Sequence, residues 1–216
     1  MQLFLDSTNI DEIKKYNTYG IIDGITTNPS LIANSGMDFN KLTSEICASI
    51  SGDVSIEVVS NDYESMIMEG KKIAAIAKNA VVKLPLTWEG IRACKYFSAN
   101  KIKVNMTLCF SASQALLAAK AGAAYVSPFI GRLEDNGEDG ISLIANIRSI
   151  YDNYGFTTKI LAASIRNQEH IIEAAIHGAD AVTVPAKVMA TLLDHDLTKI
   201  GLEKFNQDWA KSGMKI

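Results

Sequence analysis

The chain repeats one pattern along its length: a short β-branched or apolar run is followed by a longer alanine- and charge-rich stretch of helical period. The apolar runs predict strands at residues 2–5, 24–27, 54–59, 80–85, 102–107, 124–129, 159–164 and 180–185. Such alternation favours a parallel sheet with crossover helices. Eight parallel strands close a barrel, so we expect an α/β protein with the (β/α)8 TIM barrel fold.

The alternative α/β architecture is an open, doubly wound sheet. Such a sheet normally carries a glycine-rich turn for a nucleotide after its first strand. After Leu5 the chain reads DSTNID, which contains no glycine, and this weakens the alternative. The chain has no low-complexity segment and no linker rich in proline, glycine or serine. We therefore expect a single domain over residues 1–216, with roughly residues 187–216 forming C-terminal helices.

The composition disfavours several kinds of partner. Of the 216 residues, 48% are hydrophobic and 21% are charged, which is typical of a globular protein with a sizeable core. The net charge of -3 gives no global basic field for nucleic acid or an anionic membrane, although a local basic pocket is compatible with it. The N-terminus reaches Asp6 before any signal-length apolar run, and no apolar stretch approaches about 18 residues. We expect a cytoplasmic protein that binds neither nucleic acid nor membrane.

The cysteines and histidines do not indicate a metal site or a disulfide framework. They are Cys47, Cys94, Cys109, His170, His177 and His195. The cysteines are odd in number, widely spaced and free of any C-x-x-C pair. No second histidine lies at ligand spacing. We expect no metal, and we expect the cysteines to be small core residues.

Capping residues mark several expected helix starts. Three pairs have the N-cap and N3 spacing of a capping box: Asn9 with Glu12, Asn61 with Glu64, and Ser111 with Gln114. In each pair the first side chain would accept a hydrogen bond from a free amide of the first helical turn. We therefore expect helices to begin directly after Asn9, Asn61 and Ser111.

Polar residues stand at the C-terminal end of nearly every expected strand. They are Asp6, Thr26, Asn28, Glu57, Lys83, Asn105, Thr107, Ser127, Ser164 and Arg166. In a barrel these ends share one rim, where barrel enzymes place their catalytic residues. Burying an ionisable or amide group costs several kcal/mol unless the group is paired, so placements in so many strands are hard to explain as independent accidents. We expect these side chains to form one site.

Single members of this ring also have ordinary structural explanations. Asp6 could cap the first helix. Asn28 precedes Pro29 and could belong to a turn. Arg132 and Arg166 could be surface charges. Taken together, however, the residues favour a functional site over a series of unrelated structural roles.

Lys83 lies in the run AVVKLP, between apolar residues on both faces, as in a central parallel strand. A lysine in an edge strand usually extends its ammonium to water, which is the ordinary explanation. Burial in a central strand instead disfavours the charged ammonium, and Glu57 lies one expected strand away. An uncharged buried amine is a nucleophile that forms a Schiff base with carbonyl compounds. We therefore expect Lys83 to be the reactive residue.

The other polar residues fit Schiff-base chemistry on a ketose. A protonated imine withdraws electrons and makes the adjacent carbon-carbon bond breakable. Asp6 is the candidate base for the departing hydroxyl proton, and Glu57 with Thr107 is suited to shuttle protons through a water. Arg132 and Arg166 follow two of the later strands, where they can supply paired donors to a phosphate.

With Lys83, Asp6 and Glu57 placed, the sequence closely resembles the small transaldolase family, the subgroup that also contains the fructose-6-phosphate aldolases. The resemblance covers essentially the whole chain and rests on long motifs in the right order. The motifs are FLDSTN around Asp6, GITTNPSL around Asn28, VVKLPLTWEG around Lys83, VNMTLCFS around Asn105 and Thr107, AAYVSPFIGRL around Phe129 and Arg132, and AASIRN around Ser164 and Arg166.

The resemblance implies a class I aldol transfer that needs no cofactor. Lys83 would form the Schiff base, Asp6 would be the general acid/base, and Glu57 with Thr107 would activate the catalytic water. The substrate, a phosphorylated sugar, would be held by Thr26, Asn28, Asn105, Ser127, Phe129, Arg132, Ser164 and Arg166. By this analogy a dihydroxyacetone unit passes from sedoheptulose 7-phosphate to glyceraldehyde 3-phosphate. The products are erythrose 4-phosphate and fructose 6-phosphate, in the pentose phosphate pathway.

Two positions separate transferases from aldolases in the resembled family. Where the aldolases have glutamine and tyrosine, this chain has Glu57 and Phe129. A tyrosine phenol could protonate the bound enamine and release free dihydroxyacetone, whereas phenylalanine cannot donate a proton. We expect a transaldolase, with a fructose-6-phosphate aldolase as the alternative. A catalytically silent barrel that serves as a scaffold is a third interpretation, which the complete ring disfavours.

Beyond the last expected strand, Phe205 and Trp209 are four residues apart and share one helix face. They could cover the side or the bottom of their own barrel. The resemblance instead implies that the C-terminal helix packs on a neighbouring subunit of a ring-shaped homo-oligomer, a pentamer or a decamer of two pentamers. The sequence indicates an apolar C-terminal surface and leaves both interpretations open.

Overall fold

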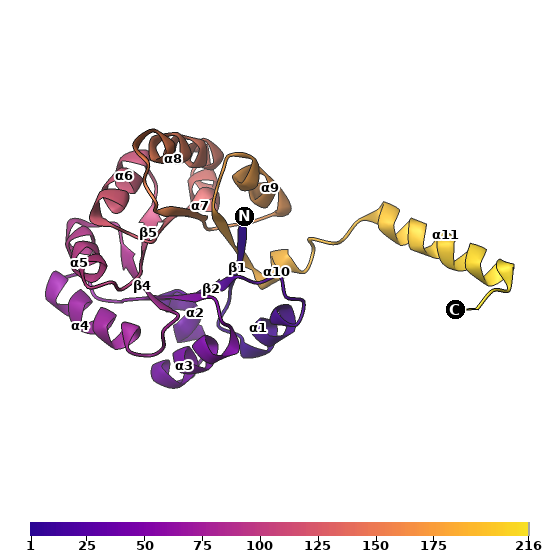
Figure 1. Cartoon of the computed structure of the whole chain (residues 1–216), viewed down its shortest axis with the longest axis horizontal. Helices are drawn as coiled ribbons and strands as arrows, with labels where there is room; N and C mark the ends of the chain where they lie inside the picture. The colour runs from indigo at the N-terminus through magenta and orange to yellow at the C-terminus, as the bar shows by residue number, and fades with distance from the viewer. Residues whose placement is uncertain (216) are drawn as a thin grey trace.

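The computed structural model describes residues 1–215. Within these residues eight parallel strands, in sequence order, form a closed barrel (Figure 1). The strands are β1 (Gln2–Asp6), β2 (Gly24–Thr26), β3 (Asp53–Glu57), β4 (Ala80–Pro85), β5 (Val104–Cys109), β6 (Tyr125–Pro128), β7 (Lys159–Ala162) and β8 (Ala181–Pro185). The expected (β/α)8 barrel is confirmed. Pairing of β8 with β1 leaves no open sheet edge in the described chain.

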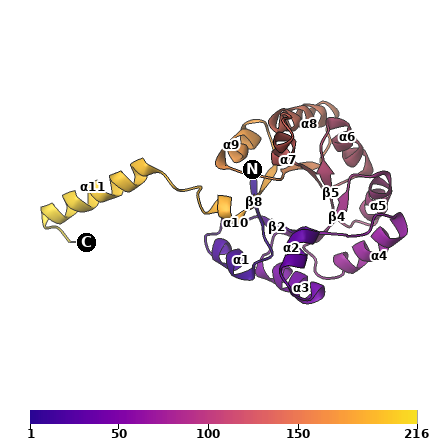
Figure 2. The same cartoon turned by 180° about the vertical axis from the view of Figure 1, so that it is seen from behind.

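Helices follow the strands and surround the barrel, as Figures 1 and 2 show from opposite sides. They are α1 (Ile10–Asn17), α2 (Pro29–Asn34), α3 (Phe39–Ser49), α4 (Tyr63–Ala74), α5 (Trp88–Ala99), α6 (Ala112–Ala121), α7 (Ile130–Asp135), α8 (Gly140–Tyr154), α9 (Gln168–Ile176), α10 (Ala186–Met189) and α11 (Asp196–Ser212). Helices α2 and α7 directly follow the C-terminal ends of β2 and β6. They therefore border the rim on which barrel enzymes place their sites.

Two of the three expected helix starts are confirmed. Asn9 and Ser111 cap α1 and α6, and their side chains accept hydrogen bonds from amides of the first turn. The prediction for α4 is wrong by one residue. Asn61 lies outside the helix, and the N-cap is Asp62, whose carboxylate accepts from the amide of Ser65. An aspartate caps as well as an asparagine, and its negative charge is also favoured at a helix N-terminus.

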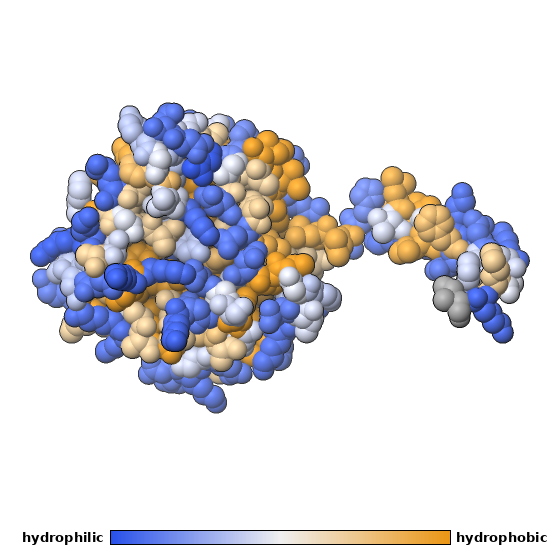
Figure 3. All heavy atoms as spheres, viewed as in Figure 1, coloured by the Kyte–Doolittle hydropathy of each residue, from blue (hydrophilic) through white to orange (hydrophobic). Residues whose placement is uncertain are grey.

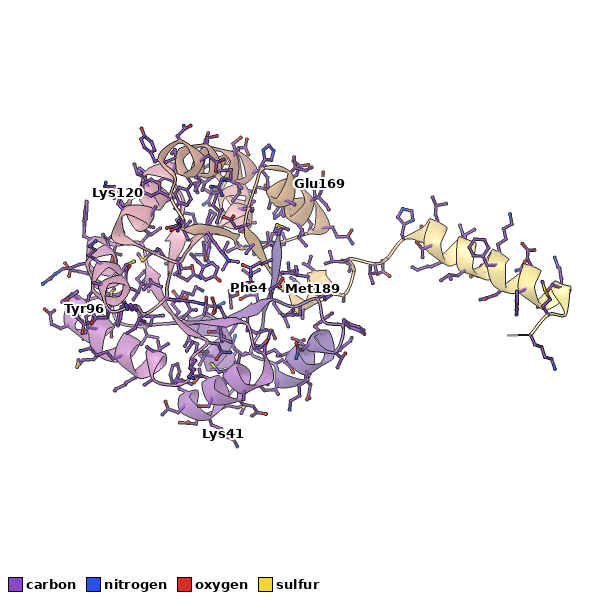
Figure 4. The ribbon with its side chains drawn as sticks, viewed as in Figure 1. Phe4, Lys41, Tyr96, Lys120, Glu169 and Met189 are labelled. Carbon is purple, nitrogen blue, oxygen red and sulfur yellow. The ribbon has the colours of Figure 1, made fainter. Side chains whose placement is uncertain are left out.

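The N-terminal half of the barrel interior is apolar. Five buried side chains from five strands form one cluster there: Phe4, Val81, Tyr125, Leu161 and Ala181. Figure 4 shows Phe4 in the middle of the ring of strands, whereas Lys41, Tyr96, Lys120 and Glu169 lie on the outer helices. The aromatic ring of Phe4 fills the space beside Gly24, where an added Cβ would lie 2.5 Å from it. This cluster closes the barrel beneath the C-terminal rim.

Two residues further along several of these strands, the inward side chains become polar. Side chains alternate between the two faces of a strand, so each polar residue shares a face with the apolar residue beneath it. The pairs are Phe4 with Asp6, Val81 with Lys83, Tyr125 with Ser127, and Ala181 with Thr183. The outward neighbours Val82 and Leu84 belong to the separate core beneath the helices. Lys83 thus stands among apolar residues because only the inner face of its strand turns polar.

The C-terminal segment stands away from the barrel. Helix α11 lies apart from it in Figures 1 and 2, and none of the helix residues is buried. Figure 3 shows apolar side chains uncovered on this segment, where Phe205 is 70% exposed and Trp209 is 45% exposed. The interpretation that they cover their own barrel is wrong, and packing on a neighbouring subunit stays a prediction. Ile216, the last residue of the expected domain and extension, lies outside the described residues.

The remaining expectations concern thiols, metals and membranes. The cysteines are buried free thiols, as expected, and burial raises the pKa of Cys47 to about 11 and of Cys94 and Cys109 to about 12. Within residues 1–215 no three side chains of histidine, cysteine, aspartate or glutamate are grouped as metal ligands. In the same part of the chain every helix is too short or too polar to span a membrane.

Candidate active site

A cavity of about 450 Å³ opens at the C-terminal ends of the strands. This volume lies in the usual range for small-molecule sites. Ten of the expected site residues line it: Asp6, Thr26, Asn28, Glu57, Lys83, Ser127, Phe129, Arg132, Ser164 and Arg166. The other two, Asn105 and Thr107, are fully buried in β5 and do not line the cavity. The structure therefore brings the expected residues together around one cavity or within its wall.

Lys83 makes two polar contacts inside the cavity. Its Nζ lies 2.9 Å from Oε2 of Glu57 and donates to the carbonyl of Thr27 at 2.8 Å. Strand register places Lys83 directly beside Glu57. The lysine is 5% exposed, and these two oxygen atoms are the polar partners of its Nζ among the described residues. The sequence placed Glu57 one strand away from Lys83, and the structure shows that its carboxylate is close enough to accept the lysine proton.

Asp6 lies at the end of β1 and does not cap α1, because Asn9 holds that position. Its Oδ1 accepts a hydrogen bond from the Thr26 hydroxyl at 2.8 Å. Burial raises the pKa of Asp6, and the positive charge of Lys83 and the Thr26 hydrogen bond partly oppose this rise. A carboxyl with a raised pKa keeps its proton closer to neutral pH, as a general acid/base requires.

The sequence left Asn28 as either a turn residue or a member of the site, and the structure shows a helix cap that also lies in the site. Asn28 precedes Pro29, the first residue of α2, and its Oδ1 accepts from the amide of Leu31 at 3.0 Å, so it caps that helix. Asn28 also lines the cavity. Because the cap uses only the amide oxygen, the side-chain NH2 group can still donate to a ligand.

Asn105 and Ser127 form a hydrogen-bonded chain with Ser55. The Ser127 hydroxyl donates to Oδ1 of Asn105 at 2.8 Å, and Nδ2 of Asn105 donates to the Ser55 hydroxyl at 3.2 Å. These bonds fix the orientation of the amide. Two residues after Asn105 on β5, Oγ1 of Thr107 is buried and lacks a hydrogen-bond partner among residues 1–215. Buried hydroxyls are normally paired, so this atom is suited to bind a water.

Two arginines stand at the mouth of the cavity. The guanidinium carbon of Arg132 lies 4.9 Å from the centre of the Phe129 ring. Arg166 follows β7 and donates from Nη2 to Oδ2 of Asp135 at 2.8 Å. Both arginines are exposed, yet both line the cavity. They are therefore more than surface charges, because together they can offer several donors to an anion at the mouth.

His170 anchors the segment that carries Arg166. Its Nδ1 accepts from the backbone N–H of Arg166 at 3.3 Å, so the ring proton belongs on Nε2, which lies 2.7 Å from Oε2 of Glu134. Gly131 permits close approach to the same segment, because a Cβ there would lie 2.1 Å from the carbonyl oxygen of Ser164. Helix α7 therefore carries the first arginine and supports the second.

A family model described as Transaldolase/Fructose-6-phosphate aldolase matches residues 3–216 of the chain. The chain belongs to this family. The expected resemblance is thereby confirmed, and the protein is an enzyme of the transaldolase/aldolase family. Three relatives named probable transaldolase, from Paracoccus denitrificans, Brucella anthropi and Roseobacter denitrificans, are each 55% identical over 216 residues. Each alignment covers 100% of this chain and 100% of the relative.

A solved structure is also similar to this transaldolase/aldolase family member. A mutant flavocytochrome b2 with pyruvate bound matches with a TM-score of 0.63 at 12% sequence identity. The match covers 86% of this chain and 56% of that chain. At this level of identity the likeness shows a shared barrel fold alone, since unrelated chemistries use the same barrel.

Two residues in unusual backbone conformations line the cavity of this family member. Leu108 has a φ of 59° and Ser164 a φ of 61°. Such left-handed values cost non-glycine residues about 1–3 kcal/mol each and are concentrated at functional sites. Leu108 lies where the pairing of β5 shifts register between Met106 and Cys109, and such bulges redirect side chains beside active sites.

Two residues of the site, Thr183 and Ser55, were not predicted from the sequence. Thr183 lines the cavity, and its hydroxyl lies 2.6 Å from that of Thr26. Ser55 supports Asn105 without lining the cavity. A signal for Thr183 was present, because it stands two residues before the proline that ends its strand, as Lys83 does in AVVKLP. For Ser55 the available signal was weaker, since it is an inward polar residue two positions before Glu57.

Proposed function

We propose that this enzyme is a transaldolase of the pentose phosphate pathway that acts in the cytoplasm. It transfers a dihydroxyacetone unit from sedoheptulose 7-phosphate to glyceraldehyde 3-phosphate, giving erythrose 4-phosphate and fructose 6-phosphate. The observation that carries the proposal is the buried lysine, with Glu57 2.9 Å from its Nζ, in the same cavity as Asp6. This arrangement supplies a nucleophilic amine, a proton acceptor for it, and a second acid/base.

The first stage is formation of the Schiff base. Glu57 takes a proton from the Lys83 ammonium, and the free amine attacks the ketone carbon of the donor sugar. The carbon-nitrogen bond forms as the carbonyl oxygen becomes a hydroxyl. That oxygen then leaves as water, with its protons shuttled by Glu57 and by a water held by the Thr107 hydroxyl, which has no hydrogen-bond partner within residues 1–215. The product is a protonated imine on Lys83.

The second stage breaks and remakes a carbon-carbon bond. Asp6 takes the proton of the hydroxyl on the carbon that becomes the aldehyde. The carbon-carbon bond then breaks, and its electron pair moves onto the imine to give an enamine. Erythrose 4-phosphate leaves as the aldehyde. The enamine carbon then attacks glyceraldehyde 3-phosphate, and Asp6 returns its proton to the new hydroxyl. Hydrolysis of the imine by the reverse of the first stage frees fructose 6-phosphate, so no cofactor is consumed.

The remaining cavity residues are proposed to hold the sugar. The transferred unit is contacted by Thr26, Asn28 and Ser127, and the phosphate by Arg132, Ser164 and Arg166. Asn105 acts from behind the cavity surface, where it accepts a hydrogen bond from the Ser127 hydroxyl. This division is supported by position, because both arginines stand at the mouth and the amide and hydroxyl groups lie deeper. Charge supports it as well, since two guanidinium groups offer paired donors to a phosphate.

Phe129 separates the proposed transaldolase from the alternative, a fructose-6-phosphate aldolase that releases free dihydroxyacetone. Its ring packs edge-to-face on Phe110 at 5.7 Å and lies beneath the guanidinium of Arg132. No proton donor is therefore provided at this position. The enamine is left unprotonated until an aldehyde acceptor arrives.

The test is a steady-state assay with and without glyceraldehyde 3-phosphate, on the natural enzyme and on Phe129→Tyr. We expect the natural enzyme to release little free dihydroxyacetone without the acceptor. Phe129→Tyr should raise this release about tenfold or more, because it supplies a general acid while keeping the aromatic packing. An unchanged ratio of release to transfer in the variant, or dominant release by the natural enzyme, would contradict the transaldolase assignment.

We further propose that α11 packs on a neighbouring subunit of a homo-oligomer, a pentamer or a decamer. The uncovered apolar side chains of this helix support the proposal. Replacing Phe205 and Trp209 together by glutamate should convert the assembly to smaller species, since two charges would enter an apolar contact. Size-exclusion chromatography with light scattering measures the mass. Asn206→Glu on the same helix is the matched control, and an unaltered mass in the double variant would count against the helix as a subunit contact.

A further inference from the structure

A chain of two hydroxyl groups leads from β8 to Asp6. The Thr183 hydroxyl lies 2.6 Å from the Thr26 hydroxyl, and the Thr26 hydroxyl lies 2.8 Å from Oδ1 of Asp6. Strand β1, which carries Asp6, lies between β2 and β8, so the two threonines approach it from both neighbouring strands. Both threonines are at most 5% exposed.

The number of protons sets the direction of this chain. A threonine hydroxyl has one proton to donate and lone pairs to accept others. When Asp6 is a carboxylate it can only accept, so the Thr26 proton is committed to Oδ1. The contact between the two threonines then requires Thr183 to be the donor. Thr183 thereby holds the Thr26 hydroxyl in the orientation that serves Asp6.

These hydrogen bonds leave one oxygen of the Asp6 carboxylate available for proton transfer. Among the described residues, the side-chain hydrogen bond to Asp6 is made to Oδ1, from Thr26. Oδ2 has no side-chain partner within residues 1–215, and Asp6 lines the cavity. Proton transfer depends on a fixed acid/base, because a misdirected oxygen lies too far from the substrate hydroxyl.

We propose that Thr183 is a positioning residue for Asp6. By donating to Thr26 it fixes Oδ1 as the anchored oxygen and leaves Oδ2 free to exchange a proton with the substrate. The inference rests on the proposed role of Asp6 as the acid/base, and it adds a residue of the eighth strand that acts through Thr26 without touching the reacting atoms.

Other charged groups of the cavity act on Asp6 independently of Thr183. The positive charge of Lys83 on β4 favours the Asp6 carboxylate and lowers the pKa of Asp6. Glu57 of β3 is paired with that lysine. Arg132 of α7 and Arg166, which follows β7, stand at the mouth. None of these groups makes a hydrogen bond to Thr183 in the described chain, so a change at Thr183 leaves their charges in place.

The experiment compares Thr183→Val, which keeps the shape and removes the hydroxyl, with Thr183→Ser, which keeps the donor. We expect Thr183→Val to lower kcat about three- to tenfold, the usual effect of one lost hydrogen bond, with little change in KM. The acid limb of its kcat/KM profile should move to higher pH. The reason is that a Thr26 hydroxyl that is free to rotate stabilises the carboxylate less, so the pKa of Asp6 rises further. Thr183→Ser should restore both kcat and the profile.

Two controls separate the possible outcomes. Thr158→Val removes another buried threonine hydroxyl, which donates to the Ala123 carbonyl just before the N-terminal ends of β6 and β7, and should leave the pH profile unchanged. Asp6→Asn tests the proposed function itself. If Asp6→Asn is inactive while Thr183→Val has the natural kcat and profile, the inference about Thr183 is overturned and the function stands. A loss of kcat in both Thr183 variants without a shift of the profile would also overturn it, since that result reflects packing alone. Retained transfer by Asp6→Asn would instead overturn the proposed function.

Discussion

Replacing Lys83 by methionine is expected to abolish both the transfer reaction and covalent capture of the sugar. Methionine fills the apolar part of the site but has no amine, so no imine can form and the carbon-carbon bond has no electron acceptor. The rate should fall by roughly 10⁴- to 10⁶-fold, the scale seen when a covalent nucleophile is removed. Borohydride reduction in the presence of fructose 6-phosphate, followed by peptide mass analysis, measures capture directly.

The control for this result is Lys120→Met, on the outer helix α6 (Figure 4). It should retain both activity and the borohydride adduct. In the natural enzyme the adduct is expected on Lys83, and an adduct on another lysine would refute the assignment. Absence of any adduct in the natural enzyme would revive the interpretation of a catalytically silent scaffold, because a Schiff base is the one step that every version of the proposed mechanism shares.

Asp6→Asn is expected to lower activity about 10²- to 10⁴-fold while making the protein more stable at neutral pH. The loss follows from removing the acid/base, whose contribution is usually of this size. The gain follows from burial, which raises the pKa of Asp6 and so makes its charged form unfavourable in the folded state. Asparagine fills the same space without that charge.

The pH dependence has a definite sign. In the unfolded chain Asp6 ionises near its ordinary value of 3.8, whereas in the folded chain it ionises at higher pH. The folded state therefore binds more protons in this window, and its stability falls as pH rises through it. The melting temperature of Asp6→Asn should exceed that of the natural protein at neutral pH, and the gap should close as pH falls toward 3.8. Asp208→Asn, on the exposed α11, should show no such gap; a gap that widens with acid would contradict the account.

Much of the barrel could be predicted from the sequence because hydrophobic periodicity and composition indicate which residues are buried. The run AVVKLP predicted β4 with its observed bounds, Ala80–Pro85. The clustering of Asp6, Glu57 and Lys83 was also predictable, because the C-terminal ends of parallel strands meet at one rim. These predictions needed only the direction and alternation of strands, which are local properties of the chain.

Contacts that depend on hydroxyl geometry or on backbone atoms were not readable. The Thr27 carbonyl that accepts from Lys83 is a backbone atom, which every residue carries, so no sequence pattern marks it. His170 was weighed as a metal ligand, but its role depends on an N–H four residues earlier, at Arg166. Thr183 was passed over because a single threonine in an apolar strand is ordinary until its partner on another strand is known.

The direction of the C-terminal helix could not be predicted for a different reason. The spacing of Phe205 and Trp209 reports that one helix face is apolar and does not report which surface covers it. The chain that joins α10 to α11 carries the helix away from its own barrel (Figure 1). Amphipathicity is thus a local signal, whereas the choice between self-packing and association depends on the path of the preceding segment.

The apolar cluster around Phe4 also limits where substrates enter and leave the barrel. It fills the barrel interior beneath the cavity, so in the described chain sugars enter and leave the cavity at the C-terminal rim. In the proposed transfer the departing aldehyde must dissociate before the incoming aldehyde can bind. The proposed enzyme would therefore follow a ping-pong scheme and alternate between a free form and a form that carries the three-carbon unit on Lys83. The two aldehydes would compete for one binding site.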